Sequence, residues 1–405
     1  RVVVPRCGTE KYYSAVGLLD YRFDLYQEVN EEMISTYHGE AGNKFYADLC
    51  VMASKIAYEN ALVIKHAVTK HWKMHFLDFF DFWNAKLERK ATQAFMFADR
   101  EEDARFVVIA FRGTEPFDSD DWKTDVDFSY FEWEGVGKIH LGFLEALGLA
   151  KRKQPGDWDC LLETLGFSNN QSTLNPKNQS LYVSPLLHAR NSYSSSLGPL
   201  ELDDKHSNPQ KPLAFYVLID KLIQLLETHK NAKFIVTGHS LGAALATLFV
   251  GVICGCKDED LKNRKSMLIE RLFAVYTFGQ PRVGDVKFAK FMNQTLNKPF
   301  TRYFRVVYSN DIVPTVPFDD DMFNYKHFGV GLHYNCFYRE KNLEEEPREG
   351  YAPNFWVGKL KYFIPERVTA ALELVGGVFR HRFEGDEYKE CNLSILCRMF
   401  GLVLP

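Results

Sequence analysis

The most chemically suggestive stretch of the sequence is residues 233–246, which contain a G-x-S-x-G pattern at 238–242. The apolar residues 234–236 precede this pattern as in a buried strand, and the alanine-rich run 243–250 after it is typical of a tightly packed helix. A serine on such a sharp strand-to-helix turn stands above the sheet, where its hydroxyl can attack a carbonyl carbon. The pattern therefore predicts a nucleophile at Ser240. The alternative is a tight turn in which this serine only caps the helix.

Other apolar stretches indicate how such a turn would be supported. Residues 106–111, 272–278 and 303–308 each have the length and composition of a buried strand. Apolar residues recur at helical spacing over 213–229, directly before the strand that leads to Ser240. Strands that alternate with helices predict an α/β fold, in which a mainly parallel central sheet carries helices on both faces.

Three residues with catalytic potential follow predicted strands, namely Thr114, Ser240 and Asp311. The carboxyl ends of parallel strands meet at one edge of a sheet, where ligands bind. A serine hydroxyl needs a histidine base that a carboxylate orients, and Asp311 can supply that carboxylate. The strand end at residues 112–114 can aim backbone N–H groups at a developing oxyanion. Asp311 could instead belong to an Asn-Asp turn, and Asp285 is a rival acid in a context typical of a helix cap.

The histidine of such a triad is not evident from the pattern. Only His327, His333 and His381 follow Asp311 in the sequence. The first two lie in a stretch rich in Tyr and Phe, and His381 lies between two arginines, whose charge would lower its pKa. His140, which precedes the nucleophile, is expected to be a structural residue.

The composition argues against several other functions. The chain has 405 residues and a net charge of −4, which gives no indication of nucleic-acid binding. Its eight cysteines lack the paired spacing of a metal site and are typical of reduced, mostly buried thiols. No run of 18 apolar residues marks a transmembrane helix. We therefore expect neither a metal nor a cofactor.

The chain is expected to form one domain over residues 1–405. Its aromatic-rich segment 72–83 is interpreted as a packing segment, with a membrane-facing patch as the alternative. The expected parts are an N-terminal helical and aromatic region (1–100), a catalytic core (101–334) with a disordered insertion at about 167–211, and a C-terminal helical region (335–405).

Taken together, these motifs resemble the class 3 (fungal-type) triacylglycerol lipases of the α/β-hydrolase superfamily. The resemblance spans about residues 106–334 and is specific because several motifs occur together. The flanks are most similar to the plant oil-body lipase branch. The matching pieces are Phe111-Arg-Gly-Thr114, Trp122 with Asp125, residues 236–246, residues 276–285 and Asn310-Asp-Ile-Val-Pro314.

The resemblance implies a role for each candidate residue. Ser240 would be the nucleophile and Asp311 the triad acid. The backbone N–H groups of Thr114 and Leu241 would form the oxyanion hole. Residues 115–127 would be the movable lid that opens at a lipid surface.

The resemblance also bears on the two ends of the sequence. In this branch the triad histidine belongs to an Ala-His-x-Pro segment just after a Leu-Pro, and this sequence stops at Leu404-Pro405. We therefore expect the catalytic histidine beyond Pro405, with His381 as the candidate within the chain. The sequence begins at Arg1, and the apolar anchoring stretch that the branch carries before its catalytic domain is expected to be missing as well.

The resulting hypothesis is a triacylglycerol lipase that hydrolyses acyl esters at a lipid surface through an acyl-enzyme intermediate. Its expected partners are an acylglycerol substrate and the surface of a lipid droplet (oil body) or of a membrane, on the cytosolic side. Two alternatives stay open at this point. One is a phospholipase A1 or galactolipase, and the other is a non-catalytic, lipase-like scaffold of lipid droplets.

Overall fold

The computed structural model describes the central part of the chain and a few positions near its beginning. Thr114, the residues 115–127, the insertion at 167–211 and His381 lie outside the described residues. The described ranges are 42–84, 89–113, 130–154, 157–160, 213–256, 259–297, 300–308, 313–317, 324–335 and 339–343, together with Asp311 and isolated positions between 9 and 25.

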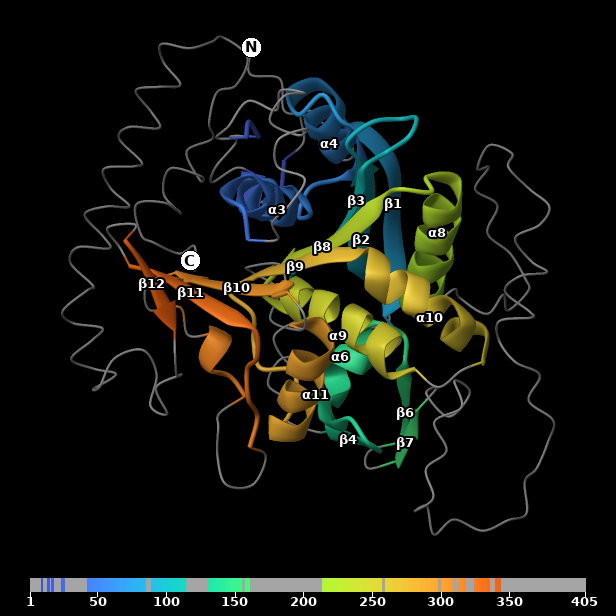
Figure 1. Ribbon diagram of the computed structural model, residues 1–405, viewed down its shortest axis with the longest axis vertical. Helices are drawn as coiled ribbons and strands as arrows, with labels where there is room; N and C mark the ends of the chain where they lie inside the picture. Colours follow the sequence, from blue (N-terminus) through green and yellow to red (C-terminus); the bar gives the residue numbers. More distant parts are fainter. Residues whose placement is uncertain are drawn as a thin grey trace.

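Eight strands of the described chain form one twisted sheet in the order β1-β2-β3-β8-β9-β10-β11-β12 (Figure 1). The five strands from β3 to β11 run parallel, while β1, β2 and β12 are antiparallel to their neighbours at the two edges. The bounds are β1 (His75–Asn84), β2 (Arg89–Ala98), β3 (Phe106–Phe111), β8 (Lys233–His239), β9 (Leu272–Phe278), β10 (Tyr303–Tyr308), β11 (Val330–Tyr334) and β12 (Glu340–Leu343). The expected mainly parallel central sheet is confirmed.

Helices cover both faces of this sheet, so that its central strands are buried on both sides (Figure 1). On β3, Val107, Ile109 and Phe111 contribute to one hydrophobic cluster, and Val108 and Ala110 contribute to the other. A continuous apolar strand thus places alternate side chains in two cores. One face carries α3 (Lys44–Ile56), α4 (Ala61–His66) and the π-helical turn η1 (Ala67–His71), and the other carries α6 (Leu141–Ala146), α8 (Ala214–Thr228), α9 (Leu241–Gly255), α10 (Glu259–Arg271) and α11 (Val286–Leu296).

Smaller elements complete the described structure. Two short hairpins lie outside the main sheet, and a 3₁₀ turn η3 (Val313–Thr315) follows β10. The hairpins consist of β4 (Tyr130–Trp133) with β5 (Gly137–His140), and of β6 (Ala150–Gln154) with β7 (Asp157–Cys160).

The aromatic segment 72–83 belongs mostly to β1 and packs into both cores. Phe80 and Phe82 are buried in the cluster under α8 and α9, and Phe76 and Phe79 pack against the cluster under α3. Both β1 and β2 lie in the N-terminal part of the chain, yet they belong to the same sheet as β8, which leads to Ser240.

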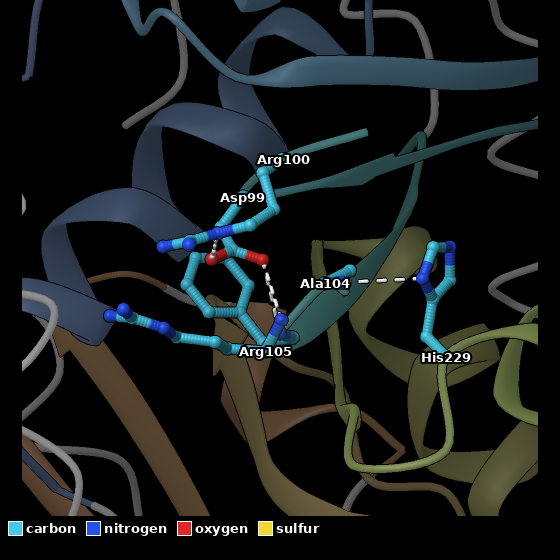
Figure 2. A network of polar contacts seen from close by, with 6 residues as sticks. Asp99, Arg100, Ala104, Arg105 and His229 are labelled. Atoms are coloured by element: carbon cyan, nitrogen blue, oxygen red, sulfur yellow. Dashed lines mark hydrogen bonds and ion pairs between the residues drawn. The ribbon is translucent and has the colours of Figure 1, made fainter. Parts of the chain in front are cut away.

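Hydrogen bonds link the segments at the end of the sheet where β3 and β8 begin (Figure 2). The carboxylate of Asp99 accepts hydrogen bonds from the Arg105 backbone N–H at 2.8 Å and from Arg100 Nε at 3.0 Å. The backbone N–H of Ala104 donates to Nδ1 of His229, which follows α8, at 3.3 Å. The bonds to Asp99 lie within the β2–β3 turn, and the bond from Ala104 ties this turn to the end of α8, at the end of the sheet opposite to Ser240.

Candidate active site

Ser240 occupies a strained turn between β8 and α9. Its backbone has φ 55° and ψ −127°, a conformation that few residues other than glycine adopt. The backbone N–H of Ser240 donates to the Phe278 carbonyl at 2.9 Å, which holds the turn against β9. The residue is 8% exposed. This is the geometry expected of a serine nucleophile, and a helix-capping role is disfavoured because the Ser240 side chain makes no capping hydrogen bond.

The two glycines of the pattern are required by close backbone contacts. A methyl group on Gly238 would collide with the backbone of Gly242. A methyl group on Gly242 would collide with the carbonyl oxygen of Phe111, at the end of β3. The sharp turn therefore packs directly against the strand end that leads to Thr114.

Leu241 is the first residue of α9, and this position gives its backbone N–H chemical significance. The first N–H groups of a helix have no partner within the helix, and the helix dipole makes this end favourable for negative charge. The N–H groups of Ala243 and Ala244 bond the Ser240 carbonyl at 2.9 and 3.3 Å, so the helix begins at the serine itself. An oxyanion formed by attack of Ser240 would lie beside this helix end.

Asp311 lies just after β10, two strands away from Ser240 in the sheet. It is 6% exposed, and its Oδ1 accepts a hydrogen bond from the Val313 N–H at 3.0 Å. Burial raises the pKa of the Asp311 carboxyl to about 6, and the bond from Val313 lowers this pKa in part. Both Ser240 and Asp311 thus follow carboxyl ends of parallel strands at the same edge of the sheet.

The side chain of His239 lies near Asp311. A methyl group built on Gly279 would be 2.7 Å from Oδ2 of Asp311 and 3.5 Å from Nε2 of His239. Gly279 has φ +55°, and its lack of a side chain leaves room for both of these side chains. Neither His239 nor Tyr58, whose hydroxyl lies 2.9 Å from His239 Nδ1, was predicted as a functional residue. The sequence gives only a weak signal for His239, which occupies a variable position of the G-x-S-x-G pattern. It gives no signal for Tyr58.

The remaining candidates for the acid and the base have other partners. Asp285 caps α11 by accepting from the Phe288 N–H at 2.9 Å, as its sequence context predicts. Nε2 of His327 lies 2.8 Å from the Pro314 carbonyl, and His333 lies within β11 beside Val307. Among the histidines that the structure describes, none bonds Asp311.

His140 also has a structural environment. Its ring stacks on Phe143 with a centroid distance of 4.0 Å, and the residue is buried. This agrees with the structural role expected for it.

Among the described residues, no group of three His, Cys, Asp or Glu side chains could hold a metal ion. No helix in the described ranges is both long enough and apolar enough to cross a bilayer.

Comparison with known proteins gives consistent matches. The model of the family "Lipase (class 3)" matches residues 108–321. Relatives named triacylglycerol lipase OBL1 match 100% of this chain and 72% of their own length, with 42% identity over 414 residues in Arabidopsis thaliana and 40% over 429 residues in Nicotiana tabacum.

Solved fungal lipases are similar at a lower level. The native propeptide complex of Rhizomucor miehei lipase is 21% identical with a TM-score of 0.40, covering 68% of this chain and 61% of that chain. The lipase of Rhizopus microsporus var. chinensis is 21% identical with a TM-score of 0.41, covering 85% and 86%.

Proposed function

The chain belongs to the class 3 lipase family, and on that premise we propose that it is a triacylglycerol lipase whose nucleophile is Ser240. The observation that carries this proposal is the turn at Ser240, which combines a positive φ, a helix start and packing against the end of β3. The relatives that match the whole chain are named triacylglycerol lipases, which supports this choice of substrate.

In the proposed mechanism, Ser240 Oγ attacks the acyl carbonyl carbon of the substrate. The serine proton passes to a histidine imidazole. The acyl carbon becomes tetrahedral, and the carbonyl oxygen becomes the oxyanion of this tetrahedral intermediate. The backbone N–H of Leu241 and that of Thr114 stabilise this oxyanion, each contributing about 10²–10³ in turnover. Collapse of the tetrahedral intermediate releases diacylglycerol, which takes its proton from the imidazolium, and leaves the acyl group on Ser240. Water then hydrolyses the acyl-enzyme and releases the fatty acid.

Asp311 is proposed to orient the histidine and to stabilise the imidazolium that forms during each step. The carboxyl has a pKa of about 6, so most of it is ionised at pH 7 and above. Its burial keeps water away, which strengthens its interaction with a positive charge. Within the described residues it accepts one hydrogen bond, so lone pairs stay available for an imidazole N–H.

We also propose that the enzyme acts at the surface of a lipid droplet or of a membrane, on the cytosolic side, and the class of substrate supports an interfacial place of action. An enzyme whose substrate forms a separate oil phase must work at the boundary of that phase. Flotation of purified droplets tests this location: the protein should float with droplets, and its recovery only in the droplet-free fraction would contradict the proposal.

The activity itself is tested with Ser240→Ala in the full-length protein, assayed on emulsified triacylglycerol beside dispersed phosphatidylcholine and galactolipid. Loss of the attacking oxygen should reduce triacylglycerol hydrolysis by about 10⁴–10⁶. Ser266→Ala, which removes an exposed hydroxyl on α10, is the matched control and should keep full activity. Undiminished hydrolysis by Ser240→Ala would refute the proposal, and faster wild-type hydrolysis of the polar lipids would change the substrate class.

A further inference from the structure

Tyr58 links the N-terminal region to the nucleophile turn. It lies between α3 and α4 and is 8% exposed. Its hydroxyl is 2.9 Å from Nδ1 of His239, and the two ring centroids are 6.0 Å apart. Because His239 directly precedes Ser240, this contact connects segments 181 residues apart at the nucleophile itself.

The same hydroxyl lies against the end of β3. A methyl group on Gly113 would collide with the Tyr58 hydroxyl and would lie 2.5 Å from the His239 carbonyl oxygen. Gly113 therefore allows the Tyr58 hydroxyl, the strand end and the nucleophile turn to meet at one point. The next residue along the chain is Thr114, the proposed second donor of the oxyanion hole.

The loop between α3 and α4, which contains Tyr58, is held by Gln93 of β2. Nε2 of Gln93 donates to the carbonyl oxygens of Ala57 at 2.7 Å and of Glu59 at 2.9 Å, on either side of Tyr58. The Gln93 carbonyl accepts from the Arg112 N–H at 2.9 Å, just before Gly113. One buried residue of β2 thus holds the tyrosine through its side chain and the strand end through its backbone carbonyl.

The charge state of His239 suits a hydrogen bond from Tyr58. Burial lowers the pKa of the His239 imidazole to about 4, so that the ring is neutral at pH 7. A neutral imidazole has one nitrogen that accepts and one that donates. If the Tyr58 hydroxyl donates to Nδ1, the ring proton is on Nε2, the nitrogen on the side of Gly279 and Asp311.

From these contacts we propose that Tyr58 is a positioning residue for the lipase reaction. Its hydroxyl fixes the nucleophile turn relative to the end of β3, and thereby aligns Ser240 with the N–H groups of Leu241 and Thr114. Tyr58 does not touch the substrate in this role and acts through His239 and Gly113. The inference rests on the proposed function of Ser240.

Tyr58→Phe tests this role because it removes the hydroxyl and keeps the buried ring. Misalignment of the reacting groups should lower kcat about ten- to a hundredfold and leave KM nearly unchanged, since substrate contacts are not altered. The rate at which diethyl 4-nitrophenyl phosphate phosphorylates Ser240 should fall by a similar factor, because this reagent needs the same nucleophile and oxyanion donors. Both kcat and the rate of phosphorylation are measured for the variant and for the wild type, together with the unfolding temperature of each.

Two further variants make the result specific. Tyr46→Phe removes a hydroxyl from another buried tyrosine, which packs on Phe106 at the opposite end of β3, and should leave kcat unchanged. In the double variant Tyr58→Phe/His239→Gln, the loss should be clearly smaller than the product of the two single losses, because both changes break one contact.

The outcomes separate this inference from the function on which it rests. Wild-type kcat in Tyr58→Phe beside an inactive Ser240→Ala would overturn the positioning role and leave the lipase proposal standing. Equal losses of kcat in Tyr58→Phe and Tyr46→Phe, or fully multiplicative losses in the double variant, would also overturn it. Activity of Ser240→Ala itself would remove the basis of the inference.

Discussion

At the scale of single residues, the candidate site holds the carboxyl of Asp311 where its charged form is disfavoured. Asp311 is buried at the carboxyl edge of the sheet, and burial raises the pKa of its carboxyl from 3.8 to about 6. Keeping this group ionised at neutral pH therefore costs about 3 kcal/mol of folding stability, at 1.36 kcal/mol per pKa unit. A stability cost at a catalytic position is expected where function requires a buried charge.

Asp311→Asn should remove this cost. Between about pH 4 and pH 6 the folded state binds more protons than the unfolded state, so this carboxyl lowers the free energy of unfolding as the pH rises. The asparagine variant lacks this effect and can keep the bond from Val313. Relative to wild type, it should gain up to about 3 kcal/mol between pH 4 and pH 7 in urea denaturation, and kcat should fall about 10⁴-fold.

The two readouts in this experiment are independent. A variant that is more stable and inactive fits a buried catalytic carboxylate. A variant that stays active would contradict the role of Asp311, and one whose stability relative to wild type does not change with pH would contradict its raised pKa.

At the scale of elements, the strands bring the site residues together. The parallel order β3-β8-β9-β10 places the ends that precede Thr114, Ser240 and Asp311 along one edge. The helices mainly cover the faces, and α9 in addition supplies its N-terminus beside Ser240. An acid that lies at the start of a helix, as Asp285 does, stabilises that helix and is expected to take no part in the reaction.

Asp285→Ala tests this distinction between a capping acid and a catalytic acid. Loss of the bond to the Phe288 N–H should lower the free energy of unfolding by about 1 kcal/mol and leave kcat near the wild-type value. A large loss of kcat at wild-type stability would instead make Asp285 the triad acid.

At the scale of the whole molecule, local sequence patterns predict the centre of the fold well. The strands predicted at 106–111, 272–278 and 303–308 have those bounds in the structure, because each is a mostly apolar run that is largely buried. The antiparallel strands β1, β2 and β12 were not predicted. They mix apolar with charged or polar residues, and their pairing depends on partners distant in the sequence.

The residues of the candidate site could be predicted from the sequence where they belong to a short local pattern. Ser240 and its two glycines form such a local pattern, and Asp311 follows a recognisable strand. Tyr58 is different, because its position against His239 and Gly113 arises only when α3, β3 and β8 pack together. The catalytic roles of Ser240, Leu241 and Asp311 stay predictions, as do those of Thr114 and His381, which also lie outside the described residues.

The central claim is that Ser240 attacks the acyl carbon, and covalent capture tests it most directly. The protein is treated with diethyl 4-nitrophenyl phosphate, digested, and analysed by tandem mass spectrometry to locate the added diethyl phosphate group. We expect one equivalent of the label on Ser240, with triacylglycerol hydrolysis lost in proportion to labelling. Labelling of another residue in step with the loss of activity, or complete loss of activity without label on Ser240, would contradict the claim.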